Sequence, residues 1–445
     1  MGHGNRAGSC FRTALALAFR RLTTPSIFCC HAVLLLVCCP GSIHATIQRR
    51  GLPVILPVVD GRDLRFIHLS STGIESHSRV AQIVQDDMGF LWFGTQDGLQ
   101  RYDGYSFREY RHDPKNPNSL SGSDSFALFK DRSGKLWVGS DEFLDRYDPE
   151  TETFSQYRPD PHDPGRFEGV LFDISQDRAG FLWLATDHGL NRLDPATWRT
   201  IRYQNRPGDP TSLSSNFVRS TFEQKDGTFW VGTSEGLDVF DRSTGKVTQH
   251  VPFPSNFLRP GQSNPYLLIS FCEDHSGVLW VTFSYGYGLA VVDRHANKLT
   301  FYSLNGAGTD NTLQGGVRAI HEDEDGILWL GTSAGGLLEL DRDRKGFVRY
   351  RSNPSDRDSL SSDQVNTVFE DRERNIWVGT TGGGVNRFAQ KPLPLRRYRH
   401  EPGNPNSLDV DYTSAIYEDS HGDIWVGSIR ALTRIDGKTG KFKFY

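Results

Sequence analysis

Eight of the nine tryptophans recur along this chain at nearly constant spacing. Neighbouring members are 45 to 50 residues apart, and they are Trp92, Trp137, Trp183, Trp230, Trp280, Trp329, Trp377 and Trp425. A repeat of this length with one fixed aromatic residue is typical of stacked four-stranded units, each of which buries a face against the next. The spacing therefore predicts an all-β fold, a β-propeller with eight repeats of a four-stranded blade.

Each repeat contains four short strand-like segments separated by turn residues. In the second repeat these segments are 126–129, 135–139, 144–148 and 154–157. An aspartate and a glycine mark the first turn, because a tight hairpin needs a side-chain acceptor and a residue that tolerates positive φ. The pairs are Asp87/Gly89, Asp177/Gly180, Asp226/Gly227, Asp274/Gly277, Asp325/Gly326 and Asp419/Gly422. The tryptophan falls in the second segment, where its ring would fill the space between neighbouring blades.

A spare strand-like segment at 66–69 precedes the first repeat. Such a segment can close a ring as the outer strand of the last blade, which predicts a seven-bladed propeller over residues 64–394. The eighth repeat, 395–445, then stands apart, after a connector at 390–394. Since an isolated blade exposes strand edges, we expect it to be the first blade of a truncated second propeller. A single eight-bladed ring is the alternative.

Residues 1–45 differ in composition from the rest of the chain. Four arginines precede an apolar run of about 13 residues, 27–39, and the small residue Ala45 follows. This pattern is typical of a secretory signal peptide cleaved near Ala45, and the run is shorter than the roughly 20 residues of a membrane-spanning helix. An uncleaved leader is the alternative. We expect residues 46–63 to be a linker and the propeller to be periplasmic.

Charge and cysteine content exclude several classes of function. The 50 basic and 54 acidic side chains are interleaved, which leaves no basic stripe for a phosphate backbone, so nucleic acid is not an expected partner. Five of the six cysteines lie in residues 1–45. Cys272 remains, without a disulfide partner, and we interpret it as a small buried hydrophobe. The histidines lack metal-ligand spacing, so we predict no metal and no cofactor.

One face of the predicted ring is the candidate binding face. The loops from fourth to first strands and from second to third strands share it, because successive strands alternate in direction. The fifth repeat departs from its siblings there, with the segment TFSYGYG at 282–288. Tyr285 and Tyr287 could stack on a sugar ring or another flat ligand, or they could plug the channel. The other candidate ligand-binding residues are Asp97, Asp141, Asp187, His188 and Glu235, joined by Arg430 if the ring has eight blades.

The repeats resemble a known family. The segment DMGFLWFGTQDGLQRYDG at 87–104, and its seven further copies, are similar to the two-component regulator propeller repeat. The resemblance implies a periplasmic sensor, often of two seven-bladed rings, followed by a β-sandwich, a membrane helix and a histidine kinase or diguanylate cyclase. The sequence contains none of these later parts. We therefore expect the N-terminal sensor part of a receptor that lacks its output domain, and no enzymatic activity in this chain.

These observations favour a ligand-sensing propeller that takes a small molecule or a glycan fragment. Membrane attachment would come only from an absent C-terminal segment or an uncleaved leader, and a receptor of this type could dimerise. One alternative is an enzyme resembling streptogramin lyases, for which His188 with Asp187 and Asp141 offers the acid–base groups. The other alternative is a secreted eight-bladed scaffold that binds a ligand or a protein.

Overall fold

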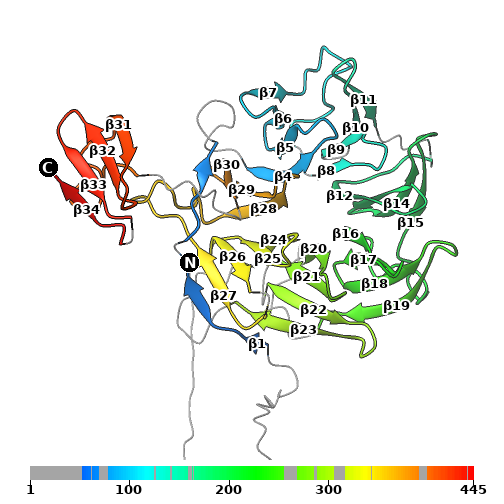
Figure 1. Ribbon diagram of the computed structural model, residues 1–445. Helices are drawn as coiled ribbons and strands as arrows, with labels where there is room; N and C mark the ends of the chain where they lie inside the picture. The colour runs from blue at the N-terminus through cyan, green and yellow to red at the C-terminus, as the bar shows by residue number, and fades with distance from the viewer. Residues whose placement is uncertain are drawn as a thin grey trace, which may run out of the picture. The chain divides into compact units, whose positions relative to one another are not determined.

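The computed structural model describes residues 53–445 except 62, 70–78, 125–126, 141–142, 159–162, 164, 255–267, 285–287, 305–315, 342, 390–397 and 438 (Figure 1). The signal-peptide prediction for residues 1–45 lies outside the described residues. The described secondary structure consists of strands, β1 to β34. The prediction of an all-β fold built from four-stranded units is confirmed.

The strands form eight sheets, which we number in chain order. Sheet 1 contains β4 (Val80–Gln85), β5 (Leu91–Thr95), β6 (Gly98–Tyr102) and β7 (Phe107–Tyr110). Sheet 2 contains β8 (Ala127–Lys130), β9 (Leu136–Ser140), β10 (Phe143–Asp148) and β11 (Thr153–Tyr157). Sheet 3 contains β12 (Leu171–Gln176), β13 (Leu182–Thr186), β14 (Gly189–Asp194) and β15 (Arg199–Tyr203). Sheet 4 contains β16 (Val218–Glu223), β17 (Phe229–Thr233), β18 (Gly236–Asp241) and β19 (Lys246–Pro252).

The later sheets repeat the same antiparallel order. Sheet 5 contains β20 (Leu268–Glu273), β21 (Leu279–Phe283), β22 (Leu289–Asp293) and β23 (Lys298–Ser303). Sheet 6 contains β24 (Val317–Glu322), β25 (Leu328–Thr332), β26 (Leu337–Leu340) and β27 (Phe347–Tyr350). Sheet 7 contains β28 (Val365–Glu370), β29 (Asn375–Thr380) and β30 (Val385–Ala389). Sheet 8 contains β31 (Thr413–Glu418), β32 (Ile424–Ser428), β33 (Leu432–Ile435) and β34 (Phe442–Phe444).

Three strands that precede sheet 1 in the chain complete other sheets. β3 (Ile67–His68) pairs antiparallel with β30 and is the fourth strand of sheet 7. β1 (Val54–Ile55) and β2 (Val58–Asp60) pair in parallel with β23 and β27, as fifth strands of sheets 5 and 6. The segment 46–63, which we expected to be a linker, thus supplies two strands, because the outer edges of sheets 5 and 6 offer unpaired backbone groups for it to bind.

The first strands of sheets 1 to 7 contact one another in cyclic order, from β4 through β8, β12, β16, β20 and β24 to β28 and back to β4 (Figure 1). Sheets with adjacent inner strands in a closed cycle are the defining arrangement of a propeller. The domain boundaries at residues 394 and 395 stay predictions.

Each tryptophan of the repeat donates its Nε1 hydrogen to the side chain six residues earlier, at 2.6 to 2.9 Å. The acceptors are Asp86, Asp131, Asp177, Gln224, Asp274, Asp323, Asp371 and Asp419. The second carboxylate oxygen of Asp131 accepts the backbone N–H groups of Ser133 and Lys135. One side chain thus closes the first turn and satisfies a buried indole.

The predicted turn residue is displaced in sheets 1 and 6. We expected Asp87 and Asp325 to be the turn acceptors, whereas Asp86 and Asp323 accept both a turn N–H and the indole N–H. Adjacent acidic residues made the sequence ambiguous at these two turns. In sheet 4 the predicted Asp226 does accept a backbone N–H of the turn, while Gln224 accepts the indole N–H.

The hydrophobic core lies between neighbouring sheets. Trp92 and Leu99 of sheet 1 share one buried cluster with Leu128 and Val138 of sheet 2. A corresponding cluster joins Trp377 of sheet 7 to residues of sheet 1. Seven of the eight repeat tryptophans are at most 2 % exposed, and burial of such a ring removes on the order of 200 Å² from water. The core interpretation of the tryptophans is therefore correct in sheets 1 to 7.

Sheet 8 has a smaller core. Its buried cluster contains Leu408, Val426 and Ile435, and every residue of β31 is exposed. Ile416 on β31 is 72 % exposed, whereas Val368, at the same position of sheet 7, is 8 % exposed. The first strand of sheet 8 therefore keeps the apolar pattern of the repeat without the burial that the pattern has in the other sheets.

Candidate functional site

The candidate binding face carries four of the predicted site residues among the described residues. Asp97, Asp187, His188 and Glu235 lie in the turns between second and third strands of sheets 1, 3 and 4. A buried threonine at the end of the second strand positions each turn, because its Oγ1 accepts a backbone N–H of the turn. Tyr285, Tyr287 and Asp141 lie outside the described residues. Arg430 is in the corresponding turn of sheet 8.

Among the predicted site residues that the structure describes, Asp187 and His188 are the pair in contact with each other. His188 Nδ1 lies 2.8 Å from Asp187 Oδ1, and the same oxygen accepts the Val170 N–H at 2.8 Å. Gly169 has φ +96, and a Cβ there would lie 2.3 Å from Asp187 Oδ1. The loop before β12 can therefore approach this pair only because residue 169 is glycine. The arrangement fixes the orientation of a half-exposed imidazole.

The loops between fourth and first strands are held by buried polar side chains that the sequence analysis did not single out. In sheet 2, Asp145 is fully buried and accepts the N–H and Oγ–H of Ser121 at 2.8 and 2.6 Å. In sheet 4, Asp238 is also fully buried, binds Ser214 in the same way and lies 2.7 Å from His250 Nδ1. Each of these aspartates lies on the third strand and pairs with the second-strand residue directly after the repeat tryptophan. An aspartate at this apolar position of the third strand is the sequence feature that could have indicated these buried carboxylates.

The first strands carry a second feature that sequence reasoning missed. A register shift interrupts the pairing of first and second strands in seven of the eight sheets, one residue after the first strand begins. A β-bulge of this kind redirects side chains at strand ends. The shifted residues include Phe172 in sheet 3, Arg219 in sheet 4 and Arg318 in sheet 6. They lie at the end of the inner strands that belongs to the candidate binding face.

The bulged residues form contacts between neighbouring sheets. The Arg219 guanidinium stacks over the Phe172 ring at 4.3 Å, and the ring of Phe172 lies 5.0 Å from that of Phe217. Asp173 accepts hydrogen bonds from Ser220 Oγ and Thr221 N at 3.0 and 3.1 Å. Burial raises the pKa of Asp173. Similar links join Arg79 to Asp124 and Arg318 to Asn366. Cationic, aromatic and carboxyl groups thus gather on the inner strands.

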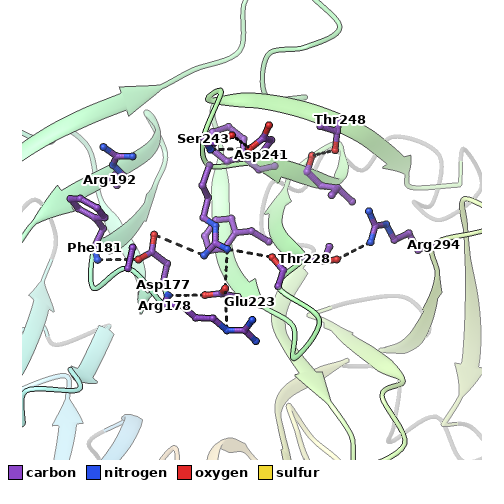
Figure 2. Close-up of a pocket in the computed structure, with 16 residues that line it drawn as sticks. Asp177, Arg178, Phe181, Arg192, Glu223, Thr228, Asp241, Ser243, Thr248 and Arg294 are labelled. Atoms are coloured by element: carbon purple, nitrogen blue, oxygen red, sulfur yellow. Dashed lines mark hydrogen bonds and ion pairs between the residues drawn. The ribbon is translucent and has the colours of Figure 1, made fainter.

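A pocket of ≈ 550 Å³ lies on the opposite face, over sheets 3, 4 and 5 (Figure 2). The turns between first and second strands and between third and fourth strands form it. Arg242 lines the pocket and lies 2.9 Å from Glu223 and 3.9 Å from Asp177. Its guanidinium stacks over the Phe229 ring at 5.1 Å. The sequence analysis placed no candidate residue on this face.

Among the described residues, no group of three or more His, Cys, Asp and Glu side chains is arranged to hold a metal ion. In the same part of the chain, no helix has the length and apolarity needed to cross a membrane.

Comparison with known families identifies the repeat. Five segments match the family described as "Two component regulator propeller", at residues 119–142, 212–235, 313–334, 359–382 and 407–430. These five segments are similar to the repeat of that family. A stretch of 58 residues, 13 % of the chain, is also 45 % identical to part of Histidine kinase P4 of Formosa agariphila and covers 4 % of that protein.

Solved structures support the same class of protein. The chain is similar to the extracellular domain of a protein described as a hybrid two-component system from B. thetaiotaomicron, with TM-score 0.64, 26 % identity and coverage of 86 % of this chain and 49 % of that one. A second extracellular domain from B. thetaiotaomicron gives a TM-score of 0.60 at 21 % identity, over 86 % of this chain and 48 % of that one. The chain spans about half the length of both.

Virginiamycin B lyase from Staphylococcus aureus shares the fold, with TM-score 0.53 and 14 % identity over 73 % of this chain and 100 % of that one. At this identity the likeness concerns the fold alone. The similarity to the two extracellular domains is greater than this in both TM-score and identity.

Proposed function

We propose that this chain is the ligand-sensing propeller of an exported receptor, and that its ligand binds on the candidate binding face. The observation that carries the proposal is the similarity over 86 % of the chain to the extracellular domain of a hybrid two-component system. The partial match to a histidine kinase supports the same assignment. The proposal includes a periplasmic location for this chain and a kinase or cyclase as the output domain of the receptor.

The chemistry of the candidate binding face supports a polar, flat ligand such as a glycan fragment. Sugar rings present apolar C–H faces that stack on aromatic side chains and hydroxyl groups that pair with charged side chains. Phe172 and Phe217 supply the aromatic surface, Arg219 and Asp173 supply the charged groups, and Tyr285 and Tyr287 would add two more rings.

A titration of the full chain with short neutral and acidic oligosaccharides tests the proposal, with heat of binding as the readout. We expect a saturable heat with at least one member of the panel. The variants Arg219→Gln and Tyr285→Ala/Tyr287→Ala should weaken it tenfold or more, because one stacking or charged contact contributes about 1–3 kcal/mol. Arg146→Gln is the matched control, since Arg146 stacks over Trp137 and Trp198 away from this face.

Export is tested separately by fractionation of expressing cells and by the mass of the recovered protein. A periplasmic product that begins near residue 46 would agree with the proposal. A product that keeps residues 1–45 in the cytoplasm would contradict it, and so would oligosaccharide binding that neither variant alters.

A further inference from the structure

Sheet 4 departs from the repeat on the face opposite the candidate binding face. In sheets 1, 2, 3, 7 and 8 an arginine stands directly across from the tryptophan, on the third strand. In sheet 4 this residue is Val239. Valine is shorter than arginine and carries no charge, so it fills less of the space across from the tryptophan than an arginine stem does; sheet 5 also has a valine, Val291, at this position. The pocket of ≈ 550 Å³ includes Val239 in its wall.

Four arginines from three sheets line this pocket, and Asp177, Glu223 and Asp241 are its three carboxylates. Figure 2 shows Arg192 and Arg294 on opposite sides of the pocket. The lining therefore has an excess of one positive charge. A volume of this size lies within the range of small-molecule sites, roughly 300–1,000 Å³.

The three carboxylates are already satisfied by the protein. Asp177 accepts the Trp183 indole N–H at 2.9 Å. Glu223 pairs with Arg242 at 2.9 Å. Asp241 accepts hydrogen bonds from Ser243 and Thr244 at 2.7 and 2.8 Å, which lower its pKa to about 2. All three carboxylates are thus engaged by the protein, and Glu223 also lies 3.5 Å from the Arg178 guanidinium.

Arg192 is the guanidinium that the pocket leaves unpaired. It stacks over the Phe181 ring at 4.4 Å, and within the described residues it makes no hydrogen bond or ion pair (Figure 2). Arg294 donates to Thr228 Oγ1 at 2.7 Å and reaches Asp226 only at 3.9 Å. A guanidinium that packs over a ring and has no carboxylate partner keeps its fork of N–H donors available for a planar oxyanion.

We propose that this pocket is a second binding site, and that it takes a small molecule bearing a carboxylate, with Arg192 as its principal anchor. The planar fork of arginine pairs with a carboxylate through two parallel hydrogen bonds, and Phe181 offers an apolar surface beside it. Because the pocket lies on the face opposite the candidate binding face, it acts independently of the ligand of the proposed function.

Galacturonate and galactose are suitable probes, because they have the same ring and differ in one carboxylate. We expect the full chain to bind galacturonate with a heat that saturates at millimolar concentration or below, and to give no heat with galactose. Equal binding of the two sugars, or no binding of galacturonate, would overturn the proposal. Displacement of galacturonate by an equal concentration of inorganic sulfate would also overturn it, since the site would then accept any oxyanion.

The variant Arg192→Gln tests the anchor without leaving a buried carboxylate unpaired. We expect at least a tenfold loss of galacturonate affinity, because a hydrogen bond to a charged group is involved. Arg146→Gln is the matched control, since Arg146 holds the same position in sheet 2 and stacks over Trp137. Unchanged affinity in Arg192→Gln would refute the site, as would an equal loss in the control. Unaltered unfolding midpoints of both variants keep the comparison valid.

Discussion

The fully buried Asp145 should make the stability of this protein fall as pH rises from about 4 to 7. Burial raises the pKa of Asp145 to about 6, against 3.8 for the unperturbed group, although the hydrogen bonds from Ser121 act in the opposite direction. Between these values the unfolded chain has lost the proton and the folded chain keeps it. Stability is therefore greatest below pH 4 with respect to this group and is lost as pH passes through 6.

The magnitude follows from the difference of about 2.2 pH units, which at about 1.36 kcal/mol per unit corresponds to about 3 kcal/mol. Asp145→Asn removes the titration and keeps the contacts, because Asn386 holds the same position in sheet 7. Its Oδ1 accepts Ser361 N at 2.9 Å and its Nδ2 donates to Ser361 Oγ at 2.7 Å. Relative to the parent protein, Asp145→Asn should therefore gain up to about 3 kcal/mol between pH 4 and pH 7.

Urea unfolding at pH 4, 5, 6 and 7, followed by tryptophan fluorescence, measures this difference. The reverse substitution Asn386→Asp is the matched control and should lose stability over the same pH range. If the stability of Asp145→Asn relative to the parent protein is the same at all four pH values, the buried carboxyl does not titrate in this window and the reasoning is wrong.

Three further predictions concern the repeat and its core. Asp131→Ala leaves the buried Trp137 indole and two turn N–H groups without an acceptor, so we expect a loss of about 3 kcal/mol in the free energy of unfolding; a loss below about 1 kcal/mol would contradict this. Gly336 has φ +82, and a Cβ there would lie 2.1 Å from Tyr350 O. Gly336→Ala should therefore lower the free energy of unfolding by more than about 2 kcal/mol, seen as a lower urea midpoint. An unchanged midpoint would count against this backbone geometry. Burial raises the pKa of Cys272 to about 12, so at pH 8 about one thiol in 10⁴ is ionised and iodoacetamide should label the native protein far more slowly than the urea-unfolded one; equal labelling rates would argue against burial.

The sequence determined the blade because the interactions that define a blade are local. The tryptophan reaches a side chain six residues earlier, and the strands that flank it pair with their immediate neighbours in the chain. Periodicity was therefore sufficient to predict four-stranded sheets, and a period of 45 to 50 residues was sufficient for a propeller. The turn acceptors in sheets 1 and 6 were misassigned because each of these turns offers adjacent acidic residues that fit the local motif equally well.

The candidate site could be predicted only in part. The turns that carry Asp97, Asp187, His188 and Glu235 follow from the alternation of strand direction, and the structure brings Asp187 and His188 together. The stack of Arg219 on Phe172 was not predictable, since it depends on a one-residue register shift and on two sheets whose contact is not visible in either repeat alone.

Only the tertiary structure decided how the units combine. β1 and β2 pair with the outer strands of sheets 5 and 6, although nothing in their sequence names those partners. For β3, in contrast, the sequence analysis had already placed the segment 66–69 as the outer strand of the last blade, where it pairs with β30. The pocket beside Arg192 is lined by residues of three sheets, including Val239 of the next sheet. Such features arise from side chains and strands that meet across different sheets. A periodic sequence specifies the structure of the common unit, but it does not specify contacts that depend on residues particular to two neighbouring units.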